Sequence, residues 1–318
     1  MIMKRSILVT GINGFVGHHV AEQLHKKGIS VIGVGNQDRV AADLTSIVDG
    51  YVSCDLTDPD QVSQINLKDV TAIINLAGFA KVGDSKGQGE LYNRVNVGVH
   101  TVLYEECLAQ GVSPRIIAIS TGAVYDPNQS LPITEESTLV TEDRTNEYVI
   151  SKMRMEASLV PYQDKGLHII IVRPFNHSGP GQLPGFLIPD LGEQITQALR
   201  DKKPLLVGNL ATKRDYTDVR DVARAYVELA TCDKSNINHS LYNICSGKSV
   251  LGSEVLRMLT SAFEADDLEI VVDQSKIRAH DVMDVFGSNA RLSEDINWQP
   301  RFSVEQMIGD YASWKKAQ

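Results

Sequence analysis

An apolar run that leads directly into three evenly spaced glycines constrains the fold of this chain more than any other feature. Residues 6–10 have the pattern of a buried strand, and Gly11, Gly14 and Gly17 follow at once. In a βαβ unit such glycines permit a tight turn, close approach of the backbone to a pyrophosphate, and close packing of helix on strand. The helix N-terminus then presents free N–H groups and its dipole to the phosphates. The pattern predicts a dinucleotide site.

The spacing is G-x-x-G-x-x-G and departs from the usual G-x-G-x-x-G, so a purely structural tight turn is the alternative. The segment that follows favours nucleotide binding. Val16, Val20 and Leu24 recur at helical spacing, and Gly28 closes the segment. The glycines therefore lie between a strand signal and an amphipathic helix, which is the context that a phosphate-binding turn requires.

Composition limits the classes of partner. The 318 residues are enough for one large or two modest domains, and 42% hydrophobic with 22% charged residues is typical of a soluble protein. A net charge of −9 argues against a nucleic-acid binder, which would carry a basic surface. An anionic ligand must then be held by local cations.

The cysteines and the hydropathy argue against a disulfide-rich, a metal-binding or a membrane protein. Cys54, Cys107, Cys232 and Cys245 are far apart, with no C-x-x-C pair and no clustered histidines. We therefore expect reduced thiols, no disulfide framework and no metal site. No apolar run approaches the length of a membrane span, so we expect no membrane partner and a cytoplasmic location.

Strand and helix patterns alternate through the first half of the chain. Strands are predicted at 30–34, 71–77, 115–120 and 167–172, and helices at 91–110 and 146–162. Continuous apolar strands between helices predict an α/β fold with a Rossmann-type doubly wound parallel sheet, covered on both faces.

The pattern changes after Arg173. Residues 174–189 are rich in proline and glycine, followed by a helix at 221–230, a strand at 240–244 and a helix that begins with a capping box at Ser303. We expect a smaller, interleaved C-terminal α/β substrate lobe. The predicted boundaries are 1–175 plus about 215–246 for the nucleotide domain, and about 176–214 with 247–318 for the lobe.

Three side chains are candidates for catalysis. The strand at 115–120 delivers Thr121 to the C-terminal edge of the sheet, where open α/β folds bind ligands. Tyr148 and Lys152 share one helix face at i, i+4. A phenol with a pKa of about 10 becomes a useful acid when a neighbouring ammonium stabilises its phenolate. Thr121 could hydrogen-bond the carbonyl oxygen that Tyr148 protonates.

The Tyr-x-x-x-Lys pattern occurs twice, so it proves nothing alone. Tyr311 and Lys315 form a second copy that lacks an upstream strand with a hydroxyl at its end. We interpret that copy as a surface helix face. The same interpretation, a helix-surface pair, is the alternative for Tyr148 and Lys152.

These motifs together resemble the nucleotide-sugar branch of the extended short-chain dehydrogenase/reductase family, and the likeness covers almost the whole chain. The motifs that carry it are Thr10-Gly11-x-x-Gly14-x-x-Gly17, Asp55-Leu56, Asn75-Leu76-Ala77-Gly78, Asn96, Ser120-Thr121 and Tyr148-x-x-x-Lys152. Residues 173–182, 214–221, 242–247 and 276–282 are more specific and resemble GDP-4-keto-6-deoxy-D-mannose reductases and close relatives.

The resemblance implies roles for individual residues. The glycine turn would cradle the cofactor pyrophosphate, Asp55 and Leu56 would contact adenine, and Lys152 would also hold the nicotinamide ribose. The full cofactor set is Gly11, Asn13, Gly14, Phe15, Val16, Gly17, Asn36, Arg39, Asp55, Leu56, Leu76, Ala77, Gly78, Asn96, Tyr148, Lys152 and Pro174. The substrate set is Thr121, Asn176, Arg214 and Arg278.

Two of the substrate residues have a structural alternative. Guanidinium forks suit a diphosphate, which favours Arg214 and Arg278 as ligands. Both could instead form surface ion pairs, with Asp215 or Asp281. We interpret His177 as a loop residue that packs or hydrogen-bonds and does not catalyse.

Two departures from relatives narrow the reaction. Related 4,6-dehydratases place an acid two residues beyond the catalytic threonine, whereas Gly122 and Ala123 follow Thr121 here and cannot move a proton. At the end of the second strand, where an acidic residue would bind the ribose hydroxyls of NAD, the chain has Gly35 and Asn36, with Arg39 nearby. NADP(H) is therefore favoured over NAD(H), although Gly35 could reflect only a tight turn.

The sequence thus predicts a reductase of the C4 ketone of a nucleotide-linked 4-keto-6-deoxyhexose, GDP- or dTDP-linked, giving a 6-deoxy sugar nucleotide for polysaccharide synthesis. One alternative is a nucleotide-sugar 4-epimerase with retained NAD, and another is a non-catalytic nucleotide-redox sensor. The resemblance also implies a homodimer formed by the helices at 91–110 and 146–162. Packing of those helices against the sheet explains their apolar residues equally well.

Overall fold

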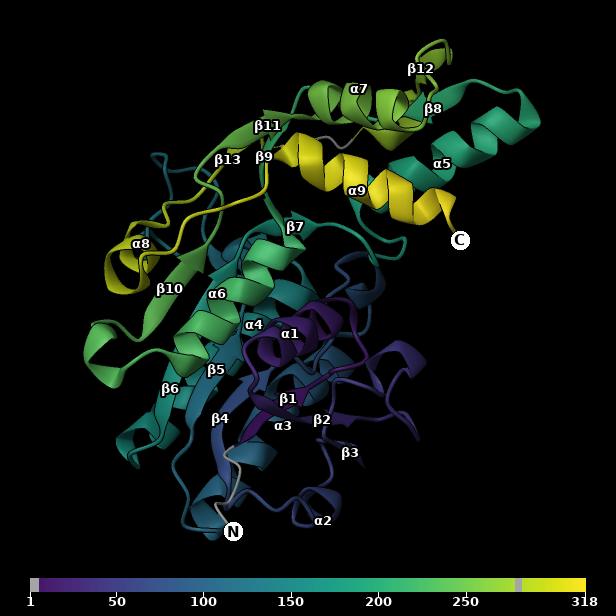
Figure 1. Ribbon diagram of the computed structural model, residues 1–318. Helices are drawn as coiled ribbons and strands as arrows, with labels where there is room; N and C mark the ends of the chain where they lie inside the picture. The colour runs from purple at the N-terminus through teal and green to yellow at the C-terminus, as the bar shows by residue number, and fades with distance from the viewer. Residues whose placement is uncertain (1–5, 278–281) are drawn as a thin grey trace.

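A parallel sheet of seven strands forms the centre of the computed structural model, which describes residues 6–277 and 282–318 (Figure 1). Its strand order is β3-β2-β1-β4-β5-β6-β10, so the chain starts in the middle, winds to one edge and then crosses to the other. The order is that of a doubly wound Rossmann sheet and confirms the predicted fold class. The strands are β1 (Ser6–Thr10), β2 (Ser30–Gly35), β3 (Gly50–Ser53), β4 (Val70–Asn75), β5 (Arg115–Ile119), β6 (His168–Pro174) and β10 (Leu241–Ile244).

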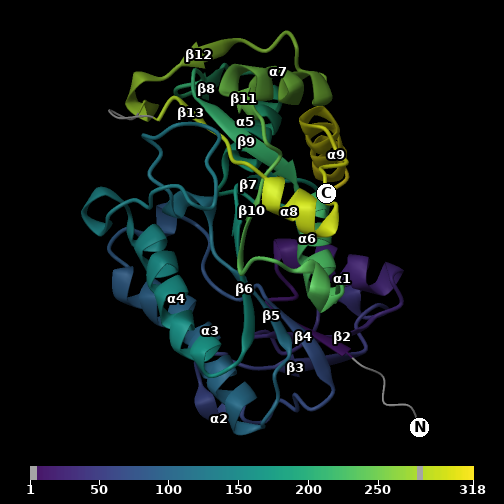
Figure 2. The same cartoon turned by 90° about the vertical axis from the view of Figure 1, so that its left-hand side faces the viewer.

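Helices cover both faces of this sheet, as Figure 2 shows: α1 (Phe15–Lys26) and α6 (Val219–Thr231) on one face, α3 (Gly89–Ala109) and α4 (Glu147–Asp164) on the other. Successive residues of a strand point to opposite faces, so a sheet covered twice needs apolar side chains at every position. In β1, Ile7 and Val9 pack in the core of α1 and α6, and Leu8 packs in the core of α3 and α4.

The sequence prediction fails at the ends and at one edge of the sheet. The strand expected at 71–77 ends at Asn75, so Leu76 and Ala77 have already left the sheet. The edge strand β3 was not predicted, because its residues are half-buried or exposed and form no apolar run. All the strands of this sheet run parallel, so the loops that follow them meet at its C-terminal edge.

A smaller part of the chain lies above that edge in Figure 1 and has its own core. It contains strands around β9 and a separate pair, β8 with β12, covered by three helices. The stretch at 174–189, expected as loop, includes β7 and the start of α5. The elements are β7 (Asn176–Ser178), β8 (Leu205–Val207), β9 (Lys213–Asp218), β11 (Ser249–Leu251), β12 (Ile270–Val272), β13 (Asp284–Val285), α5 (Leu187–Asp201), α7 (Gly252–Ala262) and α9 (Val304–Lys316).

Short helices complete the described chain: α2 (Pro59–Val62), α8 (Ala290–Ile296), η1 (Ala42–Leu44), η2 (Gly83–Ser85), η3 (Gly122–Val124), η4 (Glu142–Arg144), η5 (Lys234–Asn236) and η6 (Gln274–Lys276). The capping box predicted at the start of the last helix is present. Ser303 accepts from the Gln306 N–H, and the Gln306 side chain accepts from the Ser303 N–H.

The apolar residues of α3 and α4 lie mainly toward the sheet. Leu103 and Cys107 of α3 and Met155 and Leu159 of α4 are fully buried in the core. Sheet packing therefore accounts for these side chains, and the homodimer expected from these helices stays a prediction.

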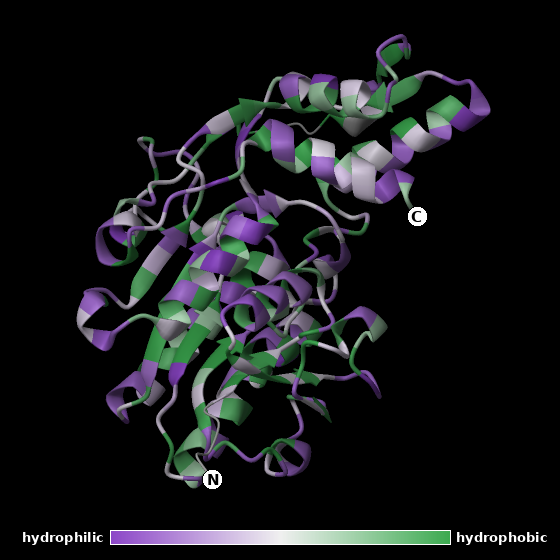
Figure 3. Cartoon of the chain, viewed as in Figure 1, coloured by the Kyte–Doolittle hydropathy of each residue, from purple (hydrophilic) through white to green (hydrophobic). Residues whose placement is uncertain are grey.

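Hydropathy follows the layers, with green apolar strands at the centre of Figure 3 and purple polar residues on the outer turns of the helices. Within residues 6–277 and 282–318, no helix combines the length and the apolar character that a membrane crossing demands.

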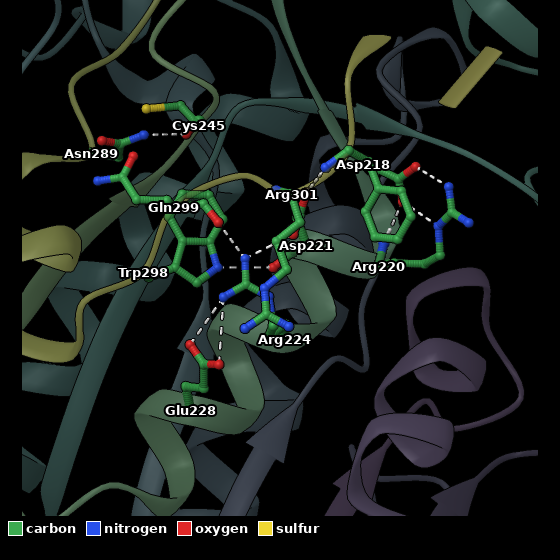
Figure 4. Close-up of polar contacts among 11 residues, drawn as sticks. Asp218, Arg220, Asp221, Arg224, Glu228, Cys245, Asn289, Trp298, Gln299 and Arg301 are labelled. Atoms are coloured by element: carbon green, nitrogen blue, oxygen red, sulfur yellow. Dashed lines mark hydrogen bonds and ion pairs between the residues drawn. The ribbon is translucent and has the colours of Figure 1, made fainter. Parts of the chain in front are cut away.

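A buried ionic cluster fastens the C-terminal segment to α6 (Figure 4). The Asp221 carboxylate, with no exposed surface, pairs with Arg224 at 2.8 Å and accepts the backbone N–H groups of Arg301 and Phe302 at 2.7 and 3.0 Å. The Trp298 indole N–H donates to the Asp221 carbonyl at 3.2 Å. Trp298 is also fully buried in the core of the large sheet, so this segment ties the two parts of the chain together.

We predict that Asp221→Ala lowers the free energy of unfolding by about 3 kcal/mol, because it leaves the buried Arg224 with only its longer pair to Glu228, at 3.3 Å, and leaves the Arg301 and Phe302 N–H groups without their acceptor. Asp310→Ala is the matched control: Asp310 also pairs with an arginine of α6, Arg220, at 2.7 Å, but its side chain is 48% exposed. Loss of an exposed pair costs about 1 kcal/mol or less. Urea unfolding of both variants measures the difference, and equal losses would contradict this account of the cluster.

Candidate active site

The glycine turn after β1 forms a cradle that no side chain could enter. Gly11 has a φ of +62°, in the left-handed region, and Gly14 is the N-cap of α1. A Cβ at Gly17 would lie 2.4 Å from the Ile12 carbonyl oxygen and 2.5 Å from that of Gly11. No side chain caps α1 and its first turn carries no acid, so its N-terminus remains open to an anion such as a pyrophosphate. These residues fit the cofactor role expected of them.

Polar contacts hold the loop after β4 beside this turn. The Thr10 hydroxyl donates to the Asn75 side-chain oxygen at 2.6 Å and accepts from the Ala77 N–H at 3.0 Å. A Cβ at Gly11 would lie 3.1 Å from the Ala77 nitrogen, so the two backbones nearly touch. The predicted cofactor residues Leu76, Ala77 and Gly78 are thereby brought to the glycine turn.

Asn13 organises the loop after β2. Its amide donates to the Arg39 carbonyl at 2.9 Å and to the Gln37 side chain at 3.2 Å, and its oxygen accepts from the Ala41 N–H at 2.8 Å. Asn36 and Arg39, both exposed, are carried by this loop. Within the described part of the chain Arg39 makes no ion pair, so its charge is available at this end of the site.

The residues predicted to contact adenine follow β3. The Asp55 carboxylate is exposed and accepts from the N–H and the hydroxyl of Thr57 at 2.9 and 2.8 Å. Leu56 is buried. Both lie at the same C-terminal edge of the sheet as the loop after β2, since β2 and β3 are parallel neighbours.

Thr121, Tyr148 and Lys152 meet where β5 ends and α4 begins. Tyr148 and Thr121 are 8% and 9% exposed, and the Thr121 side chain lies close enough to the Tyr148 phenol to favour a lower pKa of that phenol. The Lys152 ammonium donates to the Ile119 carbonyl, the last residue of β5, at 2.8 Å. Gly78 is adjacent, since a Cβ there would lie 3.8 Å from the Lys152 nitrogen. The chain thus brings the two hydroxyls and the amine to one place.

The pKa of Tyr148 does not follow the expected direction. Burial raises the pKa of its phenol above the usual value, and the contact with Thr121 offsets this only in part. Burial also lowers the pKa of Lys152 to about 8, with the Glu156 carboxylate acting in the opposite direction. In the chain alone, burial decides the pKa of Tyr148, and the Lys152 ammonium, which the sequence suggested would lower it, instead donates to the Ile119 carbonyl.

A buried ion pair beneath these residues was missed by sequence reasoning. The Arg173 guanidinium meets the Glu156 carboxylate in a two-pronged contact, and the Ser120 hydroxyl donates to the same carboxylate at 2.5 Å. Arg173 also lies 4.7 Å from the centre of the Tyr125 ring. Glu156 stands one helical turn after Lys152, and that spacing is the only signal that could have found it.

His100 is a second buried group that the sequence reading overlooked. It has no exposed surface, and its Nδ1 lies 3.1 Å from the Asn75 amide nitrogen and 2.9 Å from the Tyr104 hydroxyl. Burial, together with the charge of Lys152, lowers the pKa of His100 well below its usual value, so the ring is neutral. It therefore supports Asn75, and through it the loop after β4.

Asn96 is buried and acts on neighbouring loops. Its amide donates to the Ser151 hydroxyl at 2.8 Å and to the Phe79 carbonyl at 3.2 Å, and its oxygen accepts from the Phe79 N–H at 2.7 Å. A Cβ at Gly78 would lie 2.7 Å from that oxygen, so Asn96 shapes the backbone around Gly78. These hydrogen bonds all go to other residues of the chain, which gives Asn96 a positioning role.

Packing explains why no acid follows Thr121. A Cβ at Gly122 would lie 2.8 Å from the ring of Phe175, which is itself buried. Ala123, the next residue, is exposed. Packing against Phe175 therefore excludes a carboxylate at position 122, whereas at position 123 the argument against a dehydratase rests on the sequence, because Ala123 supplies no acid.

The predicted substrate residues lie at the junction with the smaller lobe. Pro174 ends β6 and is buried, while Asn176, two residues on in β7, is exposed. Arg214, in β9, is half-buried and donates to the carbonyls of Lys213 and Val282 at 2.7 and 2.8 Å. Arg278 lies outside the described residues. β7 pairs with β9, so Asn176 and Arg214 belong to one sheet.

The structure bears on two earlier interpretations: Asp215 as a surface ion-pair partner of an arginine, and the second Tyr-x-x-x-Lys copy as a surface helix face. Asp215 is buried and accepts the backbone N–H groups of Ser246, Gly247 and Gly287, so it is no surface residue. The reading of the second Tyr-x-x-x-Lys copy as a surface face is wrong for Tyr311, which is 1% exposed in the lobe core. Its lysine, Lys315, does lie at the surface.

His177 packs as expected. It lies in the short strand β7 and not in a loop, its Nδ1 donates a hydrogen bond to the Phe175 carbonyl at 3.0 Å, and its ring stacks on Phe15 with ring centroids 6.2 Å apart. Phe15 and Val16 begin α1, so this contact joins the phosphate turn to the smaller sheet.

Comparisons with known proteins agree with this geometry. Residues 7–245 match the model of the NAD dependent epimerase/dehydratase family. The chain is 30% identical to GDP-6-deoxy-D-mannose reductase of Pseudomonas aeruginosa over 312 residues, 96% of this chain and 95% of the relative. It is 28% identical to UDP-glucose 4-epimerase 2 of Arabidopsis thaliana over 341 residues, 98% of this chain and 95% of the relative.

A solved structure, RMD from Pseudomonas aeruginosa complexed with NADPH, matches with a TM-score of 0.83 at 28% identity, covering 99% of this chain and all of that one. Relatives with two different reactions, reduction and epimerisation, are therefore similar to this chain at nearly the same identity.

We predict that Gly17→Ala destabilises the fold by about 3 kcal/mol, because the added methyl would overlap two carbonyl oxygens. Gly309→Ala is the control: Gly309 also lies within a helix, α9, but nothing lies within 4 Å of its ideal Cβ. That variant should gain about 1 kcal/mol through helix propensity. Thermal unfolding compares the two, and a neutral Gly17→Ala would refute the close packing.

We predict that Lys152→Met stabilises the fold by about 2 kcal/mol at pH 7, the cost of the buried charge less one lost hydrogen bond. Burial lowers the pKa of Lys152 to about 8 from an ordinary 10.5. Between pH 8 and pH 10.5 the unfolded chain therefore retains a proton that the folded chain has lost. Wild-type stability therefore rises between these pH values, and the advantage of the variant should shrink toward pH 10.

Urea unfolding at pH 7 and pH 10 measures this effect. Lys165→Met, at the exposed end of the same helix, is the control and should show no such pH dependence. A Lys152→Met variant that is less stable than wild type at pH 7 would mean that its hydrogen bond outweighs the burial of its charge.

Proposed function

This chain belongs to the NAD dependent epimerase/dehydratase family, part of the extended short-chain dehydrogenases/reductases, and from that premise we propose the reaction that it catalyses. It is an NAD(P)-dependent enzyme of nucleotide-sugar chemistry. Our proposal is that it reduces the C4 ketone of a nucleotide-linked 4-keto-6-deoxyhexose, GDP- or dTDP-linked, to a 6-deoxy sugar nucleotide. The observation that carries the proposal is the burial of Thr121 and Tyr148 next to each other at the end of β5, with Lys152 one helical turn after Tyr148 and bonded to the last residue of β5.

The chain's own residues supply the proton and the orientation. Tyr148 donates its phenolic proton to the oxygen at C4, and Thr121 hydrogen-bonds the same oxygen. With a pKa of about 8, Lys152 is mostly protonated at neutral pH, and its charge stabilises the phenolate left behind. When bound, the reduced nicotinamide supplies the hydride. Burial of all three groups excludes water and strengthens these interactions.

NADP(H) is the cofactor that we propose. The loop after β2, which Asn13 holds by hydrogen bonds, carries Arg39, and Arg39 has no ion pair in the described chain. The last residue of β2 is Gly35, where a family member that binds NAD would have an acidic residue. A 2′-phosphate would meet a cation there and no carboxylate at the strand end. Similarity to the RMD structure that holds NADPH supports this choice.

The substrate end is proposed on similar grounds. Guanidinium groups bind diphosphates in a forked geometry, which suits Arg214 for the nucleotide diphosphate. Asn176 and Arg214 lie on the paired strands β7 and β9 of the smaller lobe. Arg278 is the third proposed substrate residue, and it is assigned by resemblance alone.

We predict that Tyr148→Phe lowers kcat for a 4-keto-6-deoxy nucleotide sugar by about a thousandfold or more, because the proton donor is lost. NADPH affinity should change little, since the ring remains. Tyr311→Phe is the matched control: it alters the other Tyr-x-x-x-Lys copy, which lies in the lobe core, and should leave kcat unchanged. Steady-state NADPH oxidation and fluorescence titration provide the two readouts. Undiminished turnover by Tyr148→Phe would remove the mechanism.

A nucleotide-sugar 4-epimerase is the second candidate, favoured by the similarity to UDP-glucose 4-epimerase 2. It would use the same hydroxyls but oxidise and re-reduce one carbon with retained NAD. The absorbance spectrum of the purified protein separates the two. Tightly held NAD and turnover without added reductant would favour the epimerase. Failure to turn over any keto-sugar nucleotide would point to a non-catalytic redox sensor.

A further inference from the structure

Two glycines of β2 leave room for an aromatic ring from the next strand. Gly33 and Gly35 lie on the same face of β2, and Tyr51 of β3 is the register partner of Gly33. A Cβ at Gly33 would lie 2.8 Å from the Ile12 side chain and 3.3 Å from the Tyr51 ring, and a Cβ at Gly35 would lie 2.9 Å from the Tyr51 hydroxyl oxygen and 3.0 Å from the end of the Gln37 side chain. The ring of Tyr51 therefore extends along β2 over both glycines and ends at the C-terminal edge of the sheet.

Hydrogen bonds fix the end of this ring. The Tyr51 hydroxyl donates to the Gln37 carbonyl at 2.7 Å, and the Asn13 amide donates to the side chain of the same Gln37 at 3.2 Å. Asn13 belongs to the glycine turn and also holds the Arg39 carbonyl. Tyr51 is thus joined both to the phosphate turn and to the loop that carries Arg39, while its ring packs against the core below α1.

We propose that Tyr51 is a specificity-determining residue that sets the preference for the 2′-phosphate of NADP(H). Its ring and hydroxyl fill the space that a carboxylate at the end of β2 would need to reach the ribose hydroxyls of NAD. The same hydroxyl holds the loop so that Arg39 faces a 2′-phosphate. The inference rests on the proposed use of NADP(H), but not on the identity of the sugar.

One acidic side chain remains in the loop and must be accounted for. Asp38 is exposed, three residues beyond the strand end, and its charge acts on the Tyr51 hydroxyl. If Asp38 were the ribose ligand, Asp38→Asn would lower the affinity for ADP. The proposal expects Asp38→Asn to leave ADP affinity unchanged, and a selective loss of ADP affinity would overturn it.

The decisive experiment compares binding of 2′,5′-ADP and ADP to the full chain by calorimetry. Wild type should bind 2′,5′-ADP about tenfold or more tightly than ADP, as expected for a charged hydrogen bond. Gly35→Asp alone should gain no ADP affinity, because Tyr51 occupies the space. Gly35→Asp with Tyr51→Ala should gain ADP affinity and lose 2′,5′-ADP affinity, each by about tenfold.

The control for an added charge is Gly50→Asp, on the neighbouring strand, where nothing lies within 4 Å of an ideal Cβ. It should change neither affinity. Equal gains of ADP affinity in Gly35→Asp and in the double variant would overturn the proposal, as would no gain in the double variant.

Single changes at Tyr51 test the proposal if Gly35→Asp does not fold. Tyr51→Ala should lower 2′,5′-ADP affinity about tenfold and leave ADP affinity unchanged, with Tyr51→Phe intermediate because only the hydroxyl is lost. Equal losses for both ligands would mean a merely structural role and would overturn the proposal. None of these measurements needs a sugar substrate. A wild type without preference for 2′,5′-ADP therefore defeats this inference, whereas the Tyr148→Phe assay alone decides the reaction.

Discussion

The close contact between the first turn of α1 and the turn after β1 is the constraint on which the site depends. No Cβ fits at Gly17, because two carbonyl oxygens already stand within 2.5 Å of its position. This contact directs the uncapped helix N-terminus at the edge where the parallel strands end. It also fixes Asn13, and through Asn13 the loop after β2, so the phosphate end and the adenosine end of the site share one anchor.

Buried charge provides the second layer of organisation. Lys152 is almost fully buried, and the Glu156–Arg173 pair lies just below it with Ser120 bound to the same carboxylate. Such groups stabilise a fold weakly or not at all, because desolvation offsets their attraction. Their value here is positional: they hold α4 against β5 and β6, and thereby hold Tyr148 against Thr121.

Much of this could be predicted from the sequence, because the periodic signals are local. The apolar runs and the glycine turn identified the sheet, and the i, i+4 spacing with a strand ending in a hydroxyl brought Thr121, Tyr148 and Lys152 together. The missed features depend on partners distant in sequence. Arg173 meets Glu156, His100 meets Asn75, and the ring of Tyr51 covers two glycines of a different strand. Tyr311 was expected at the surface because nothing in the sequence near its Tyr-x-x-x-Lys motif indicates burial. Its burial depends on how the helices of the smaller lobe pack together.

Exposure at the two ends of the site bears on the choice between reduction and epimerisation. A reductase must release its oxidised cofactor after each turnover, whereas an epimerase regenerates its cofactor in place. The end of the site where we propose the nicotinamide binds is formed by buried groups such as Tyr148 and Lys152, but the end proposed for the adenosine presents Asn36, Arg39 and Asp55 on the surface. Contacts to exposed charges are screened by salt and are individually weak. A dinucleotide held in this way is oriented firmly where the chemistry occurs and loosely where it enters, and that asymmetry suits a cofactor that is exchanged in every cycle.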